Sequence, residues 1–575
     1  MVKKAPVSLE GIVTDPQEGV DLLSHDTIIS FDVETTGLSP FRDNIALIQM
    51  WGNNTRTPVI IRIWDGVVPE CVKGLFSEGG RTYVGHNVGG FDVLFADTHG
   101  IDWKANRWFD TLIGEGIIST TGRRDVSRNL KNSIRRRLGL EINKDIKHGG
   151  WTNEELSEEQ LMYAVTDVVY LQDLMNEQIR KATEQGQLEA LNMEMDLVPI
   201  VAQMTLNGLP LVTSHLQTWL DEQRVIESKT KDWLVENLGD INFNSPKQIL
   251  DAFEAKGFEL PNTQKGTLLE IANYGEGLCS ELAANLLKYR APAQRLKMYQ
   301  PSWQKMHITD DWVHARFWSV GTDTLRFSSS NPNLQQIPKD GRCIIGNLPG
   351  MRIVSADYSQ IEVHIAAEIA GDEKLKDILK SGDVHRGVAS QVFGIPPEEI
   401  TDAQRRTAKA ATFTLLFGGG PGVLYQYSRN SGSNITEDDA REIFTKFFLA
   451  FDGLHTMRKR AYGMAQNRRV VTVQLPNTAK RLLIGRNISG PRIMNTAVQG
   501  SAAVGIKYAL LEADRMGLMN YIGATVHDEI VAAVPDGEVE EYKKQLEEAM
   551  IIGMKRVFPE INVKVEVKDG FYWQP

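Results

Sequence analysis

The chain has 575 residues, 42% hydrophobic and 24% charged, which is the composition of an ordinary globular protein with room for three to five domains. Its formal net charge of −11 argues weakly against nucleic-acid binding by the whole surface, although local basic surfaces can still bind it. The three scattered cysteines form no disulfide or zinc pattern, and we see no signal peptide or membrane span, so we expect a cytoplasmic protein without a membrane partner.

The first third of the chain predicts an α/β domain. Residues 27–34 indicate a buried strand that ends in acidic side chains, and residues 44–63 indicate further strands. Helical patterns follow and end near residue 187. We therefore expect a domain with a mixed sheet over residues 1–188.

The remaining two thirds predict an α+β region over residues 189–575. Long amphipathic helices dominate from Glu189 onward. A strand is expected at 351–357 and a strand pair around 524–535, with helices through residue 480 between them. We place the boundary between the two regions near residue 188. Its position is approximate, because no low-complexity linker marks it.

Four acids and a tyrosine in the first region suit metal-assisted phosphodiester hydrolysis. Asp32 and Glu34 lie two apart on a predicted strand, so their carboxylates share a face and can meet one metal ion. Asp92 adds a third acid, and Tyr163 and Asp167 lie four apart on a predicted helix. Two metal ions held by such acids can activate a water molecule and stabilise the leaving oxygen, while the tyrosine hydroxyl orients the water.

This ordered set resembles the DEDD 3′–5′ exonuclease family in its tyrosine-bearing form, over about residues 25–185. The resemblance implies an RNase H-like mixed sheet and proofreading hydrolysis from a 3′ end. It implies Asp32, Glu34, Asp92 and Asp167 as metal ligands and Tyr163 as a further catalytic residue. Asp110 lies in a segment that also resembles the family, but we assign it no metal.

A basic run lies between these acids. Its members are Arg123, Arg124, Arg128, Lys131, Arg135, Arg136 and Arg137, opposed only by Asp125. Two interpretations stay open at this point: a solvated helix face, or a surface that contacts a phosphate backbone.

Two carboxylate segments in the second region predict a second metal site. Asp357 and Asp528 lie 171 positions apart, each beside a short apolar run that is rich in β-branched residues. We expect them to hold two metal ions that activate a primer 3′-hydroxyl and neutralise charge in nucleotidyl transfer. The main-chain oxygen of Tyr358 offers a further ligand.

A helix between these segments carries Arg405, Lys409, Phe413 and Phe417 at a spacing of four. On an α-helix this spacing drifts by only about 40° per step, so the two cations share a face with Phe413. The cations suit a triphosphate, and Lys409 also offers a proton to the departing pyrophosphate. The aromatic rings suit stacking on a base and a sugar.

Asp357–Glu362, the Arg-x3-Lys-x3-Phe helix and Val526–Glu529 resemble motifs A, B and C of family A, the polymerase I-like DNA polymerases. Three further segments, at 324–329, 333–338 and 495–500, support the resemblance, which covers about residues 190–575. It implies a right-hand fold, with the thumb at about 210–320 and the fingers at about 373–485. The palm is then built from 189–209, 321–372 and 486–575. Glu362 and the exonuclease motifs argue against a single-subunit RNA polymerase.

The resemblance also implies roles for residues around the metal site. Glu362 would exclude a ribose 2′-hydroxyl, and Arg326 and Gln499 would contact the minor-groove edge of the primer terminus. The full nucleotide-binding set is Arg405, Lys409, Phe413, Phe417, Gln360, Glu362, His385 and Tyr358. The DNA-binding set is Arg326, Asn495, Gln499 and His527.

The chain departs from the family pattern at two positions. Phe417 stands where a tyrosine usually precedes the glycine, which removes an expected hydrogen-bond partner of Glu362. His364 stands where an arginine is common. Phe413, in place of tyrosine, predicts poor use of dideoxynucleotides.

The compact two-module length resembles a bacteriophage replicative polymerase, which would act in the host cytoplasm. We expect two Mg²⁺ ions per site, with Mn²⁺ as an alternative, and a monomer. The expected partners are primer-template DNA and dNTPs. A replicative helicase-primase and a single-strand binding protein are candidate partners.

Overall fold

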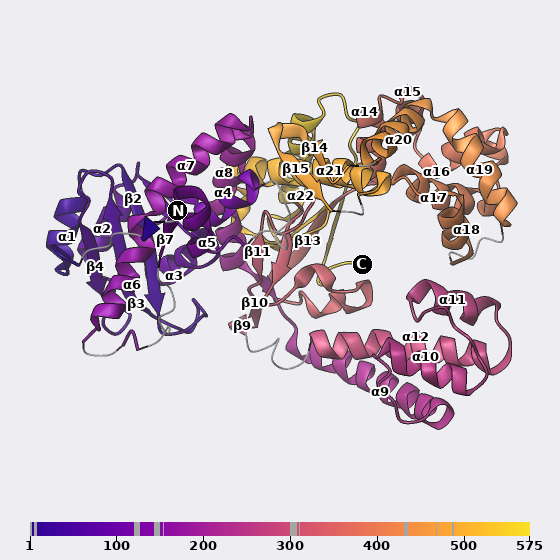
Figure 1. Cartoon of the computed structure of the whole chain (residues 1–575), viewed down its shortest axis with the longest axis horizontal. Coiled ribbons are helices and arrows are strands. Elements are labelled where there is room, and N and C mark those ends of the chain that lie inside the picture. The colour runs from indigo at the N-terminus through magenta and orange to yellow at the C-terminus, as the bar shows by residue number, and fades with distance from the viewer. Residues whose placement is uncertain are drawn as a thin grey trace.

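A computed structural model shows an elongated molecule in which the N-terminal third lies beside a larger region (Figure 1). The structure describes residues 3–4, 9–119, 127–142, 150–152, 155–299, 308–309, 311–430, 435–466, 468–485 and 488–575. The two catalytic regions predicted from the sequence are built on two separate sheets.

The N-terminal region is built on a five-stranded mixed sheet in the order β4-β3-β2-β5-β6. Its strands are β2 (Ile28–Thr35), β3 (Ile45–Gly52), β4 (Pro58–Arg62), β5 (Thr82–Gly85) and β6 (Arg107–Asp110). The central strand β2 pairs antiparallel with β3 and parallel with β5. The mixed sheet predicted from the sequence is therefore confirmed.

The two faces of β2 have different roles. Ile29, Phe31 and Val33 are buried in an apolar cluster on one face, because side chains alternate along a strand. Asp32 and Glu34 consequently lie on the other face, next to helix α6 (Glu158–Val169). The other helices here are α1 (Pro16–Leu23), α2 (Glu70–Ser77), α3 (Asp92–Thr98), α4 (Thr111–Ile118), α5 (Leu130–Leu138) and α7 (Leu171–Glu184). A short parallel pair joins β1 (Lys3–Lys4) and β7 (Leu140–Glu141).

Helix α8 (Leu188–Asn207) connects the two regions and packs on both. It contacts β6 on one side and strand β16 (Ile522–Val526) and helix α21 (Gly490–Arg515) on the other. Glu194 of α8 forms a fully buried ion pair with Lys507 of α21. The predicted boundary at residue 188 stays a prediction, because α8 belongs to the packing of both regions.

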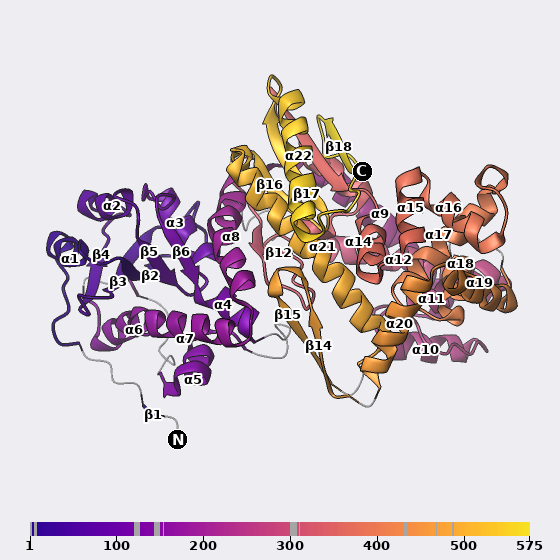
Figure 2. The ribbon, with the colours of Figure 1, turned by 90° about the horizontal axis from the view of Figure 1, so that it is seen from above.

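The second sheet has the order β16-β17-β13-β18 and is antiparallel throughout. Its other strands are β13 (Met351–Tyr358), β17 (Glu529–Pro535) and β18 (Val565–Gly570). Helices α21 and α22 (Val539–Val557) pack against each other, and α22 contacts β13, β17 and β18 (Figure 2). This sheet corresponds to the predicted palm.

Two helical arms extend from this sheet. The first consists of α9 (Thr213–Leu238), α10 (Pro246–Ala255), α11 (Lys265–Tyr274) and α12 (Gly277–Met298). This arm, the predicted thumb, has its own apolar core, which includes Phe243, Phe253 and Leu282. Two small sheets flank this arm in sequence: β8 (Leu209–Pro210), β9 (Ile308–Thr309) and β10 (Trp312–Val313) form one, and β11 (Arg316–Trp318) and β12 (Ser328–Ser330) form the other.

The second arm, the predicted fingers, is also helical. It contains α14 (Ile361–Ala370), α15 (Glu373–Ser381), α16 (Val384–Phe393), α17 (Asp402–Leu416), α18 (Pro421–Asn430), α19 (Glu437–Ala450) and α20 (Asp452–Ala465). Thr401 and Gln404 form a capping box at the start of α17. Gly418, at a φ of 80°, follows the end of this helix.

A hairpin of β14 (Val470–Gln474) and β15 (Lys480–Ile484) follows the second arm. From the sequence we expect the fingers to extend to residue 485, but this hairpin packs toward the N-terminal region. Its buried Val471 and Val473 share an apolar cluster with residues of α4, α7 and α8. The backbone N–H of Lys480 donates to the Gln187 side chain just before α8.

Candidate active sites

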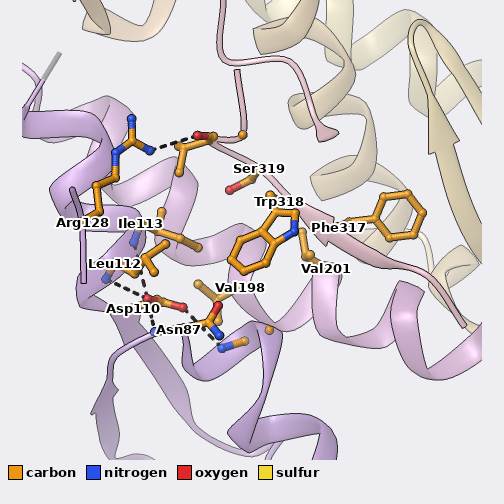
Figure 3. Close-up of a pocket in the computed structure, with 14 residues that line it drawn as sticks. Asn87, Asp110, Leu112, Ile113, Arg128, Val198, Val201, Phe317, Trp318 and Ser319 are labelled. Carbon is orange, nitrogen blue, oxygen red and sulfur yellow. Dashed lines mark hydrogen bonds between the residues drawn. The ribbon is translucent and has the colours of Figure 1, made fainter. Parts of the chain in front are cut away.

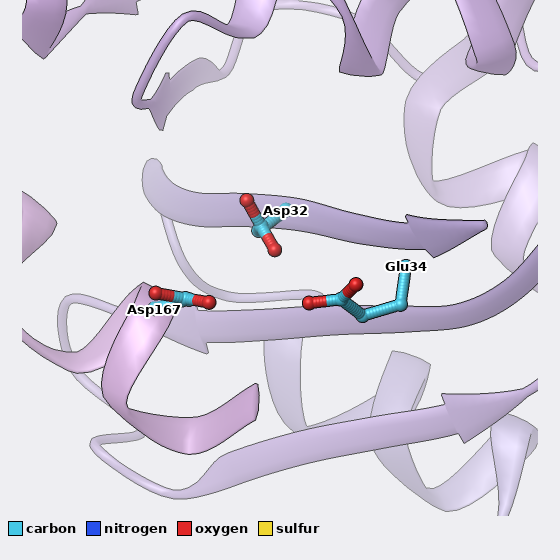
Figure 4. Close-up of side chains that lie close together, drawn as sticks. All are labelled: Asp32, Glu34 and Asp167. Carbon is cyan, nitrogen blue, oxygen red and sulfur yellow. The ribbon is translucent and has the colours of Figure 1, made fainter. Parts of the chain in front are cut away.

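Three carboxylates gather between helix α6 and the face of the N-terminal sheet next to it. Ligand oxygens of Asp32, Glu34 and Asp167 all lie within 4.8 Å of one another. The side chains project from β2 and α6 toward one shared space (Figure 4). Negative charges at this separation repel one another, and oxygen ligands of this kind suit Mg²⁺ or Mn²⁺. The cluster therefore fits a divalent cation.

Asp92 and Tyr163 lie beside this cluster. Asp92 is buried, and its Oδ1 accepts a hydrogen bond from the backbone N–H of Val33 at 3.0 Å. Burial and the charge of Asp32 raise the pKa of Asp92 well above its usual value. Burial and the neighbouring carboxylates also raise the pKa of Tyr163, so its hydroxyl stays neutral and can donate a hydrogen bond.

Asp110 has a structural role. Its Oδ1 accepts hydrogen bonds from the backbone N–H groups of Asn87 and Leu112, both at 2.9 Å, and so caps α4. It lines a cavity of about 20 Å³ between the two regions (Figure 3). This volume suffices for about one water molecule and excludes a nucleotide.

The second acidic site lies at one end of the palm sheet. Asp357 is the second-last residue of β13, and Asp528 lies in the two-residue turn between β16 and β17. His527, at a φ of 58°, occupies the left-handed conformation that such a turn favours. The backbone N–H of Tyr358 donates to the Asp528 carbonyl at 3.3 Å. The sheet thus joins two segments that are far apart in sequence.

The electrostatics of this end of the sheet favour a bound cation. Desolvation, followed by the charges of Glu529, Asp528 and Glu566, raises the pKa of Asp357 to about 6. Burial raises the pKa of Asp528 to about 6 as well. A divalent cation would relieve this repulsion, and the carboxylate oxygens match Mg²⁺ chemistry. The residues present therefore fit a metal site.

Arg326 and Glu362 meet at this site. The Arg326 guanidinium donates to Glu362 Oε1 at 2.6 Å and lies 3.7 Å from Asp528 Oδ1. From the sequence, Glu362 was expected to lack a partner because Phe417 carries no hydroxyl, but Arg326 supplies one in this structure. Phe417 lies immediately after α17 and packs against the main apolar core.

Helix α17 brings the predicted phosphate-binding residues together. Arg405 Nε donates to Asp383 Oδ2 at 2.8 Å, which holds it beside the start of α16. The His385 and Phe413 rings lie 5.7 Å apart. Burial, then Lys409 and Arg405, lowers the pKa of His385 to about 4, so this ring is neutral near pH 7. His385 of α16 and Arg405, Lys409 and Phe413 of α17 thus form one group within the fingers.

Comparisons with known proteins identify both regions. The model for "DNA polymerase family A" matches residues 214–575, which is more than half of the chain. The chain belongs to DNA polymerase family A. The model for "3'-5' exonuclease" matches residues 12–182, so this family A polymerase carries an exonuclease domain in front.

The relatives named DNA polymerase I are bacterial. The chain is 29% identical to the Aquifex aeolicus protein, with 96% of both chains covered. It is also 29% identical to a Streptococcus pneumoniae protein, but it spans only 45% of that relative's length. Among solved structures, the polymerase domain of Pol1 from M. smegmatis aligns with a TM-score of 0.80 at 21% identity. That alignment covers 98% of this chain and 99% of the other, and supports the fold.

The remaining predicted residues lie around the palm site. Gln360, at a φ of 53°, separates β13 from α14. Asn495 and Gln499 are half-buried, one turn apart on α21. Within the described part of the chain, no hydrogen bond or ion pair links these three residues to Asp357 or Asp528, so their roles stay predictions.

Part of the basic run stabilises the polymerase internally. Arg136 and Arg137 both pair with Glu115, whose side chain is fully buried, at 2.5 Å and 2.9 Å. Arg128 is buried and donates to the Val320 carbonyl. Neither open interpretation fits Arg128 and Arg137, which are turned toward protein, whereas Arg136 is also exposed to solvent and both interpretations stay open for it. Arg123 and Arg124 lie outside the described residues.

Glu529, Arg342 and Trp573 form a hydrogen-bonded network next to Asp357, which the sequence did not indicate. Glu529 lies opposite Asp357 in the sheet register. Its Oε2 accepts from Arg342 at 2.8 Å and its Oε1 from the Trp573 indole N–H at 2.8 Å. Arg342 also stacks on the Trp573 ring at 4.1 Å. The position of Glu529 directly after Asp528 was the one available signal.

Proposed function

We propose that this polymerase extends a DNA primer by template-directed transfer of deoxynucleotides and removes mispaired nucleotides at the 3′ end. The strongest support for this proposal is that Asp357 and Asp528 lie at the same end of the palm sheet, beside Glu362 and Arg326. The Pol1 domain of M. smegmatis, which has the same fold, is described in complex with primer-template DNA and dNTP, and this supports the same ligands here.

Asp357, Asp528 and the Tyr358 carbonyl would hold two Mg²⁺ ions, or Mn²⁺, at the palm. Bound there, these ions supply an activated 3′-hydroxyl and charge neutralisation on the triphosphate. The position of both carboxylates on a rigid sheet fixes where the primer end and the α-phosphate must meet.

Residues of the fingers would bind the incoming nucleotide. Arg405 and Lys409 offer positive charge to its phosphates, and neutral His385 offers a hydrogen bond. Lys409 is placed to give a proton to the departing pyrophosphate. Phe413 supports the base, and Glu362 excludes a 2′-hydroxyl by occupying the space beside the sugar.

In the exonuclease domain, Asp32, Glu34, Asp92 and Asp167 would hold a second pair of metal ions. The neutral Tyr163 hydroxyl donates a hydrogen bond that orients the attacking water. Asp32 and Glu34 lie on β2, Asp167 on α6 and Asp92 at the start of α3, so all four acids come from the N-terminal domain.

Other properties follow from the family resemblance. We propose that the enzyme works as a monomer in the cytoplasm, with a helicase-primase and a single-strand binding protein as replication partners. The described residues contain no helix with the length and apolar character needed to cross a membrane. The bacteriophage replicative type stays a prediction, since the Aquifex and Streptococcus relatives are bacterial.

Primer extension tests the proposal directly. The purified chain, a labelled primer on a longer template, four dNTPs and Mg²⁺ should give full-length product, and EDTA should abolish it. With dNTPs omitted, the same mixture should shorten the primer from its 3′ end. Failure to incorporate even one nucleotide with either Mg²⁺ or Mn²⁺ would overturn the polymerase assignment.

A further inference from the structure

The two helical arms of the polymerase touch each other. Helix α11 of the thumb and helix α18 of the fingers lie side by side in both views (Figures 1 and 2). Both arms are rooted in the palm sheet. Their contact therefore closes a loop of protein formed by palm, thumb and fingers.

One residue of the fingers, Arg429, makes several directed contacts with the thumb. The Arg429 guanidinium pairs with Glu270 Oε1 of the thumb at 3.1 Å. It also lies over the Tyr274 ring, 3.6 Å from the centroid. The Tyr274 hydroxyl donates to the Arg429 carbonyl at 3.1 Å, so side chain and main chain both engage the thumb.

Arg429 is held ready for this contact by its own helix. Its Nη1 donates to the Tyr425 hydroxyl at 2.8 Å, one turn earlier on α18. The side chain is only 20% exposed, although it belongs to an arm tip. A planar guanidinium with a carboxylate and an aromatic face as partners makes directional contacts that a lysine could not reproduce.

The contact between thumb and fingers is mostly polar, so the two arms can separate. A cavity of about 200 Å³ lies between the arms, and its lining includes Asn262, Gln264, Thr267, Gln426 and Asn430. Water can replace such contacts without exposing apolar surface. Because exposed ion pairs and cation–π contacts are individually weak, this contact can open and close repeatedly.

We propose that Arg429, Glu270 and Tyr274 form a latch that closes the thumb onto the fingers and encloses the duplex. The latch opens when DNA enters the cleft. Once closed, it prevents DNA from leaving sideways between nucleotide additions. This gives the polymerase a second function, topological retention of its substrate, and it rests on the proposed primer extension.

Two substitutions on opposite arms test the latch against simple DNA binding. With unlabelled trap DNA in excess, Arg429→Ala and Glu270→Ala should each shorten the product per binding event by about fivefold, as expected for loss of one such contact. If Arg429 merely binds a phosphate, removal of Glu270 leaves product length unchanged or greater. That result would overturn the latch.

Matched controls separate this effect from misfolding and from failure of the proposed function. Arg441→Ala removes a fingers cation whose ion pairs among the described residues are with Glu437 and Asp438 of its own helix, and should change product length less than twofold. Single-nucleotide incorporation with enzyme in excess should stay at the parent rate in all three variants. If the parent itself incorporates nothing, the proposed function fails, not the latch.

Covalent closure gives a second measurement. The substitutions Glu270→Cys and Arg429→Cys are combined in a chain with Cys71, Cys279 and Cys343 replaced by serine. After loading on primed circular DNA, a short bis-maleimide joins the two introduced thiols. The joined enzyme should stay on the circle in high salt and leave when the circle is cut. Equal loss from intact and cut circles would show that the arms do not enclose DNA.

Discussion

The two acidic sites of this polymerase differ in how far the protein alone assembles them. In the exonuclease domain, three carboxylates from β2 and α6 already lie within 4.8 Å of one another. In the polymerase domain, the acids lie on the palm, while Arg405 is held by Asp383 on the fingers. The Arg326 guanidinium meanwhile forms an ion pair with Glu362 and lies 3.7 Å from Asp528 Oδ1. If the proposed assignments are correct, the hydrolytic site is assembled within one domain, whereas the site for synthesis draws its residues from the palm and from the fingers.

The largest expected effect comes from the palm acids. Asp357→Asn should lower the rate of primer extension by about 10³-fold or more, because loss of a metal ligand removes charge stabilisation of the transition state. Single-turnover extension in Mg²⁺ measures it. The control is Asp569→Asn on strand β18 of the same sheet, which removes a carboxylate that pairs with Lys543 of α22. Normal extension by Asp357→Asn would show that the metal assignment is wrong.

The matching change in the other site should separate the two activities. The double variant Asp32→Ala, Glu34→Ala should degrade a labelled single strand about 10³-fold more slowly, because two of the three clustered ligands are gone. Extension by the same preparation should stay within about twofold, since the site lies in another domain. Retained degradation would contradict the N-terminal assignment.

A smaller effect should follow from opening the contact between Glu362 and Arg326. Glu362→Ala should raise incorporation of ribonucleotides relative to deoxynucleotides by about 10- to 100-fold, the range for one steric contact in a pocket. Competition between rATP and dATP measures this ratio. Glu368→Ala on the same helix, where the carboxylate pairs with Lys376, should leave the ratio unchanged. Equal ratios for Glu362→Ala and parent would exclude a steric gate.

The smallest effect concerns stability at His364. Burial, then the charge of Lys564, lowers the pKa of His364 to about 4. The unfolded chain therefore binds a proton first as pH falls below about 6.5, and the parent loses stability relative to His364→Gln. We expect a difference of about 1 to 2 kcal/mol between pH 7 and pH 5, measured by urea unfolding. The arginine common in the family would place a permanent charge here, so His364→Arg should destabilise at every pH.

Local patterns predicted the exonuclease acids well because they depend on short spacings. Asp32 and Glu34 share a face through the period of a strand, and Tyr163 and Asp167 through the period of a helix. The family resemblance then supplied the pairing of Asp357 with Asp528, which no periodicity contains. The fold and the class of enzyme were therefore accessible from the sequence, and the roles of the individual site residues stay predictions.

Contacts between distant segments were not accessible in this way. Arg326 with Glu362, and Arg342 with Glu529 and Trp573, depend on how strands and loops pack in three dimensions. The pairing of Arg136 and Arg137 with the buried Glu115 carboxylate is a further contact of this kind, which the basic run itself does not reveal. Charge along a sequence does not show whether its partner is solvent, DNA or protein.

The buried pair between Glu194 and Lys507 has a consequence for how a mispaired primer is corrected. A slide of α8 past α21 that kept both side chains buried would leave each charge without its partner, which costs several kcal/mol. Since α8 also packs on β6 and α4 of the exonuclease domain, it connects that domain to the palm. We therefore expect the two sites to keep a constant distance during catalysis. The faulty end of the DNA has to unpair and travel that distance itself, so correction begins with melting of the duplex rather than with a swinging domain.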